Sequence, residues 1–158
     1  MIPTPSATLA TFRCAWNAFA AGVNQSAALP SGALGTLATK RILIAEDDPK
    51  IAELIGRALQ REFVVVCAAD GAEALAKATR EPPDLLLTDV MMPLMDGFHL
   101  ARQVRLLPGL QRLPIVFLTA DDRPSSQIHG IRLGARHFIS KPFVVKDLIE
   151  RVRAILGP

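Results

Sequence analysis

A chain of 158 residues is long enough for one globular domain with some length left over. Half of its residues are hydrophobic and 21% are charged, which excludes a disordered or fibrous protein. The net charge of +3 is too small to indicate a nucleic-acid partner, and the two cysteines exclude a disulfide framework and fit the reducing cytoplasm, where we expect this protein.

Residues 1–39 differ in composition from the rest of the chain. Arg13 is their only charged side chain, and alanine, threonine and serine are frequent. Polar residues and prolines interrupt the uncharged stretch, so it predicts neither a membrane span nor a secretory signal. We therefore expect an Ala/Thr/Ser-rich, flexible extension over residues 1–39, no membrane association, and a separate domain over residues 40–158.

Five short apolar runs after the extension are predicted to be β-strands. They are continuous rather than alternating, which is typical of parallel strands that are covered on both faces. The predicted strands span residues 41–45, 63–67, 85–87, 115–118 and 137–139.

Helices are predicted between these strands. Apolar residues recur with the spacing of one helix face over residues 51–59 and again over residues 145–156. Asp48, which precedes a proline, is expected to cap the first of these helices, and Asp96 to lie in the turn that starts another. Gly134 is expected to end a helix before the last strand. The alternation predicts an α/β fold with (βα)5 order and a doubly wound, five-stranded parallel sheet.

Polar residues stand where the predicted strands end. Glu46 and Asp47 follow the first strand, Asp89 the third, Thr119 the fourth and Lys141 the fifth. In an open parallel sheet these strand ends share one edge, where ligands bind. Carboxylates without a histidine or cysteine favour Mg²⁺, and a lysine can contact a phosphoryl oxygen. An aspartate beside Mg²⁺ can itself be a nucleophile that forms an acyl phosphate, so the set predicts phosphoryl chemistry.

The strand-end residues belong to four longer segments of the sequence. These read ILIAEDDP, LLLTDVMMPLMDG, VFLTA and GARHFISKPF, at residues 42–49, 85–97, 116–120 and 134–143. In this order they resemble the receiver domain of bacterial response regulators, such as the chemotaxis regulators, and the resemblance extends over residues 40–156. It implies a flavodoxin-like fold and a role in two-component signal transduction.

The resemblance implies a chemical role for three of these residues. Asp89 would accept a phosphoryl group from a phosphohistidine on a sensor histidine kinase or a histidine phosphotransfer protein. Thr119 and Lys141 would contact the phosphoryl group, and the peptide between Lys141 and the following proline would be cis.

The resemblance also implies a Mg²⁺ site. Glu46, Asp47 and Asp89 would hold the ion, together with the backbone carbonyl of Met91. Asp48 follows the acidic pair and is more simply explained as the helix cap.

A conformational switch is implied as well. Thr119 would move toward the phosphoryl group, and Phe138 would turn inward to fill the vacated space. The output surface would consist of the fourth helix, fifth strand and fifth helix, through which the phosphorylated protein would bind a downstream protein or a second copy of itself. Arg136 and His137 stand where many family members have acids, so charge pairing on this surface is expected to differ from that of the usual dimer.

Other classes of protein fit the sequence less well. Haloacid-dehalogenase-type phosphatases need a second acid two residues after the nucleophile, where this chain has Met91, so we expect a phosphoacceptor and not a turnover enzyme. A degenerate receiver that acts only as a phosphorylation-independent interaction module is disfavoured by the complete set of strand-end residues. Direct DNA binding is not expected, because only Gly157 and Pro158 follow the last predicted helix, unless the chain is a fragment of a larger regulator. We therefore expect a stand-alone receiver.

Overall fold

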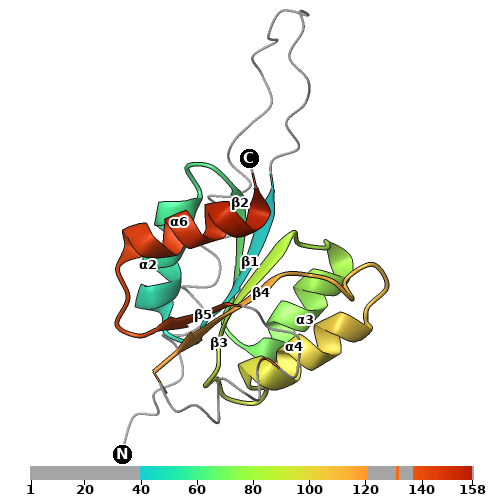
Figure 1. The fold of residues 1–158 in the computed structure, drawn as a ribbon. Coiled ribbons are helices and arrows are strands. Elements are labelled where there is room, and N and C mark those ends of the chain that lie inside the picture. Colours follow the sequence, from blue (N-terminus) through green and yellow to red (C-terminus); the bar gives the residue numbers. More distant parts are fainter. Residues whose placement is uncertain (1–39, 121–130, 132–136, 158) are drawn as a thin grey trace, which may run out of the picture. The chain divides into compact units, whose positions relative to one another are not determined.

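A computed structural model of the protein describes residues 40–120, 131 and 137–157 (Figure 1). The expected extension over residues 1–39 lies outside these residues. The same holds for Gly134 and for nearly all of the segment in which the helix between the last two strands is expected.

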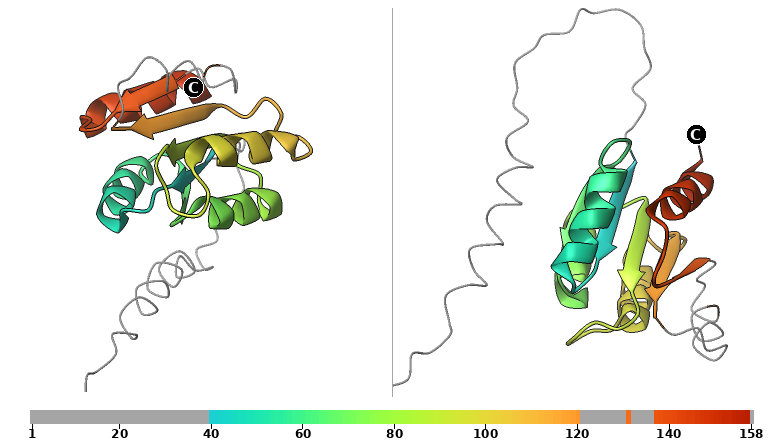
Figure 2. Two further views of the ribbon diagram at one scale, coloured as in Figure 1. Left: turned by 90° about the horizontal axis from the view of Figure 1, so that it is seen from below. Right: turned by 90° about the vertical axis from the view of Figure 1, so that its left-hand side faces the viewer.

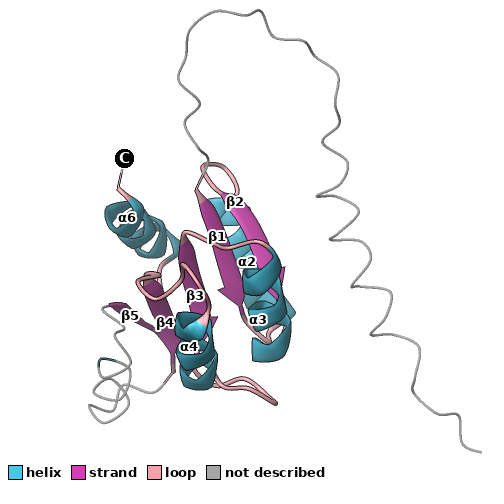
Figure 3. Cartoon of the chain, turned by 90° about the vertical axis from the view of Figure 1, so that its right-hand side faces the viewer, coloured by secondary structure: helices cyan, strands magenta, loops and turns pink. Residues whose placement is uncertain are grey.

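Five parallel strands form one sheet in the order β2-β1-β3-β4-β5, and Figure 3 shows them side by side in this order. The strands are β1 (Arg41–Ala45), β2 (Val64–Ala68), β3 (Leu85–Asp89), β4 (Ile115–Thr119) and β5 (His137–Ser140). The described helices are α2 (Pro49–Leu59), α3 (Gly71–Arg80), α4 (Gly97–Leu106) and α6 (Val145–Leu156). The predicted five-stranded parallel sheet is confirmed, and the fold is flavodoxin-like.

Helices cover both faces of the sheet (Figures 1 and 2). One apolar layer contains Ile42 and Ile44 of β1 with buried residues of α2 and α6. The other contains Leu43 and Ala45 of the same strand with buried residues of α3 and α4. Successive side chains of a strand point to opposite faces, so a continuous apolar run contributes side chains to both apolar layers.

Five strand boundaries differ from the predicted ones by one or two residues: β2, β4 and β5 each end one residue later, and the start of β2 and the end of β3 also move. β2 begins one residue later than expected, because the amide of Phe63 donates to the carbonyl of Leu59 and closes the turn after α2. β3 continues through Asp89, which pairs in register with Leu118 of β4.

Among the described residues, no helix is both long enough and apolar enough to cross a membrane.

Candidate functional site

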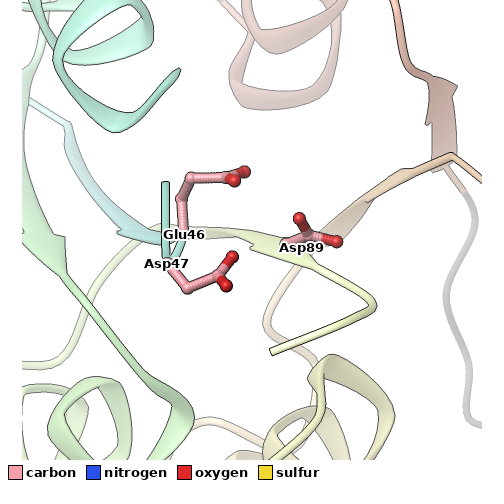
Figure 4. A group of neighbouring side chains, drawn as sticks. All are labelled: Glu46, Asp47 and Asp89. Carbon is pink, nitrogen blue, oxygen red and sulfur yellow. The ribbon is translucent and has the colours of Figure 1, made fainter. Parts of the chain in front are cut away.

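Three carboxylates meet at one edge of the sheet. Glu46 and Asp47 follow β1 directly, and Asp89 is the last residue of β3, the strand next to β1. One oxygen from each of the three side chains lies within 4.8 Å of the others. Glu46 and Asp89 are buried and Asp47 is exposed, and Figure 4 shows the carboxylates of Glu46 and Asp47 turned toward the side where Asp89 lies.

Lys141 supplies the positive charge of this site. Its Nζ donates to both carboxylate oxygens of Glu46, at 2.9 and 2.8 Å, and also to Oδ2 of Asp89. The backbone amide of Lys141 donates to the carbonyl of Thr119, which ties the residue after β5 to the end of β4. The peptide between Lys141 and Pro142 is cis, as the resemblance implied.

The charges of the site depend on one another. Burial raises the pKa of Glu46, the hydrogen bond from Lys141 lowers it and the charge of Asp89 raises it, and together they bring this pKa to about 7. Burial opposes the charge of Lys141, but hydrogen bonds to Asp89 and Glu46 raise its pKa above the ordinary lysine value. Lys141 is therefore charged at neutral pH, whereas Glu46 is divided between its neutral and ionised forms.

The backbone around Asp89 holds its carboxylate in place. The amide of Met91 donates to Oδ1 of Asp89 at 2.9 Å, so each carboxylate oxygen has a donor. The Thr88 hydroxyl donates to the backbone carbonyl of Asp89 at 2.9 Å. The Met91 amide thus lies beside the acid, and the proposed use of the Met91 carbonyl as a metal ligand stays a prediction.

Gly97, the first residue of α4, lies against the same backbone. A Cβ at this position would be 2.1 Å from the carbonyl oxygen of Asp89 and 3.1 Å from the Thr88 hydroxyl. The Gly97 amide donates to the carbonyl of Val90 at 2.9 Å, which folds the loop back onto the strand end. Asp96 lies at the start of α4, as predicted, and caps this helix by accepting from the His99 amide, whereas the contact of Gly97 with the end of β3 was not predicted.

Asp48 is the N-cap of α2, as predicted. Its carboxylate accepts from the backbone amides of Lys50 at 2.8 Å and Ile51 at 3.4 Å. It is also absent from the three-carboxylate cluster.

We expect Asp48→Ala to lower the free energy of unfolding by about 1 kcal/mol, because the first turn of α2 loses its acceptor. Urea unfolding measures this loss. Asp48→Asn is the matched control and should stay close to the wild type, since asparagine caps a helix about as well as aspartate. An equal loss in both variants would contradict the assignment as a cap.

The two predicted switch residues lie near each other on neighbouring strands. Thr119 is buried at the end of β4, and Phe138 of β5 pairs in register with Phe117 of β4. The rings of Phe138 and Phe117 stack with centroids 5.5 Å apart, and Phe98 of α4 lies 4.8 Å from Phe117 at a tilted angle. Of the predicted output surface, the structure describes the fifth strand and the last helix.

Comparison with known proteins gives one consistent family. The model of the response regulator receiver domain matches residues 42–153. The chain is 41% identical over 120 residues to the alkaline phosphatase synthesis transcriptional regulatory protein PhoP of Bacillus subtilis, a match that covers 74% of this chain and 48% of the relative. It is also 41% identical over 117 residues to the response regulator MprA of Mycobacterium leprae, covering 73% and 50%. The chain thus spans about half the length of the curated relatives it matches.

Solved structures resemble the fold over a similar range. The chemotaxis protein CheY4 of Vibrio cholerae superposes with a TM-score of 0.72 at 33% identity, covering 75% of this chain and 99% of that one. The receiver domain of the sensor histidine kinase PA1611 of Pseudomonas aeruginosa, with a magnesium ion coordinated in its active-site cleft, has a TM-score of 0.69 at 29% identity and covers 77% and 100%.

Proposed function

The chain belongs to the family of response regulator receiver domains, and on that premise we propose that Asp89 accepts a phosphoryl group from a phosphohistidine. The donor is a sensor histidine kinase or a histidine phosphotransfer protein, and the phosphorylated form signals by binding a protein partner. The observation that carries this proposal is the direct ion pair between Lys141 and the Asp89 carboxylate, beside two further acids.

The proposed reaction transfers one phosphoryl group between two side chains. A carboxylate oxygen of Asp89 attacks phosphorus, the phosphorus–nitrogen bond of the donor breaks, and the bonding pair leaves with the imidazole. The product is an acyl phosphate on Asp89. Lys141, already in contact with Asp89, neutralises charge on the phosphoryl oxygens, and Thr119 donates to one of them.

The donor set of the site also suits Mg²⁺. The ion prefers oxygen ligands and one or two carboxylates, and it supplies charge neutralisation to a transferring phosphoryl group. Glu46, Asp47 and Asp89, with the carbonyl of Met91, would hold it. The magnesium ion coordinated in the related PA1611 receiver supports this assignment.

Incubation with acetyl phosphate and Mg²⁺ tests the proposal. We expect the protein to gain the mass of one phosphoryl group, and Asp89→Asn to gain none, because an amide cannot form the acyl phosphate. Asp96→Asn is the matched control from the same loop and should still be labelled, since Asp96 only caps α4. Labelling of Asp89→Asn to the level of the wild type would overturn the proposal.

We expect the affinity for Mg²⁺ to fall about tenfold between pH 8 and pH 6, because a proton on Glu46, whose pKa is about 7, competes with the ion. Isothermal titration calorimetry at the two pH values measures the change. In Glu46→Gln the affinity should be low at pH 8 and nearly independent of pH. A wild-type affinity that is equal at pH 6 and pH 8 would contradict the prediction.

The proposal places this phosphoacceptor in the cytoplasm and does not include turnover of a substrate. A receiver that acts by itself and a receiver within a longer regulator, as PhoP and MprA are about twice the length of the matched region, are both compatible with it. A phosphorylation-independent interaction module is a further alternative, and the acetyl phosphate experiment distinguishes it from a phosphoacceptor.

A further inference from the structure

β5 is the edge strand of the sheet that the described residues form, so half of its backbone groups have no neighbouring strand among these residues to pair with. The Lys141 amide donates to the carbonyl of Thr119 in β4, and backbone directions alternate along a strand. The backbone amide and carbonyl of Ile139 therefore point toward β4, whereas those of Phe138 point away from the sheet.

A side chain from α6 takes the place of the missing strand at Phe138. The guanidinium of Arg151 donates through Nη1 to the Phe138 carbonyl at 2.9 Å. α6 packs on the sheet face that includes α2, through the buried Leu148 and Val152. Arg151 thus reaches past the edge of the sheet from this layer.

The ring of Phe138 belongs to the opposite layer. It stacks on Phe117, which is fully buried and also contacts Phe98 of α4. One residue is therefore held from both sides of the sheet: its ring by the aromatic stack on one face, its carbonyl by Arg151 from the other. Because side-chain rotamers depend on backbone conformation, a fixed carbonyl also restrains the ring.

We propose that Arg151 is a positioning residue that holds Phe138 in the observed arrangement and thereby opposes the switch. The inference rests on the proposed function. In the observed arrangement both carboxylate oxygens of Asp89 are engaged, by the Met91 amide and by Lys141, as suits the unmodified acid. A hydrogen bond that stabilises this arrangement, and not the switched arrangement of Phe138, shifts the population toward the unswitched form.

Beryllofluoride with saturating Mg²⁺, which imitates the acyl phosphate, provides the test. We expect Arg151→Ala to bind it about fivefold more tightly than the wild type, the effect of losing one hydrogen bond from the unmodified arrangement. Arg151→Lys keeps a donor and should lie between the two. Arg153→Ala is the matched control: it lies on the same helix but pairs with Glu62 and should bind like the wild type.

A gain in affinity distinguishes this role from simple structural damage, which would weaken binding. Unchanged or weaker binding by Arg151→Ala overturns the inference. A second measurement needs no phosphoryl analogue: the amide nitrogen shift of Ile139, which shares its peptide with the Phe138 carbonyl, should change in Arg151→Ala and not in Arg153→Ala. A wild type that binds no beryllofluoride would refute the proposed function, while the Ile139 shift would still decide whether Arg151 positions Phe138.

Discussion

Replacement of Lys141 by alanine is expected to lower the free energy of unfolding by about 3 kcal/mol at pH 8 in the absence of divalent ions. The lysine is 15% exposed and bonds to two buried carboxylates, which its removal leaves facing each other. At an effective dielectric constant near 20, two such charges about 4 Å apart repel by roughly 4 kcal/mol.

The loss should be smaller at pH 5.5. Lys141 stays charged across this range because its pKa is raised, so the pH dependence comes from Glu46. With Lys141 present, Glu46 is mostly ionised at pH 8, above its pKa of about 7; Lys141 lowers this pKa, so the variant must at pH 8 either take up a proton on Glu46 or keep two facing charges. At pH 5.5 Glu46 is mostly neutral in both proteins, so this cost disappears. Added Mg²⁺ should restore part of the stability at pH 8 by binding only the folded state.

Urea unfolding at the two pH values measures these differences. Lys146→Ala is the control, since Lys146 is 81% exposed and pairs only loosely with Glu150 on the surface of α6. Such an exposed pair contributes little, and its loss should be small at both pH values. A loss in Lys141→Ala that did not change with pH would show that the carboxylate pair does not cause it.

Replacement of Gly97 by alanine is expected to lower the free energy of unfolding by about 3 kcal/mol or more. The new Cβ would lie 2.1 Å from the carbonyl oxygen of Asp89, and the obstacle is backbone, which has no rotamer to change. Either α4 or the end of β3 must shift, so labelling of Asp89 by acetyl phosphate should fall as well.

Gly109→Ala separates this clash from the general effect of removing a glycine. Gly109 has a φ of 83°, and a Cβ there would meet nothing within 4 Å. Its replacement should cost only the backbone strain, about 1 kcal/mol. Thermal and urea unfolding compare the two variants, and equal stability would contradict the role assigned to Gly97.

The parts of the structure that could be predicted follow from local pattern. Continuous apolar runs indicated buried parallel strands, and their common edge placed Glu46, Asp47, Asp89 and Lys141 together. The Asp48 cap was predictable because its acceptor and donors lie within three residues of one another.

The contacts that were missed depend on geometry between distant segments. The close approach of Gly97 to the Asp89 carbonyl has a signal in the sequence, the aspartate–glycine pair, but that signal indicates a turn and not its neighbour. The hydrogen bond from Arg151 to the Phe138 carbonyl has no signal in the sequence. A basic residue on an exposed helix position has the same sequence pattern whether or not it contacts another segment. Residues 1–39 remain a matter of prediction.

The site is divided along the chain as well as across the sheet. Its acids all lie between Glu46 and Asp89, while its cation, Lys141, comes after the last strand. During synthesis the acidic part therefore emerges first, and until β5 pairs with β4 those carboxylates have no lysine beside them. A chain cut between β4 and β5 would separate the carboxylates of the site from its lysine, and only reassociation of the two pieces would restore a complete site. Competence for phosphoryl transfer would then report that the last strand, β5, has paired with the rest of the sheet.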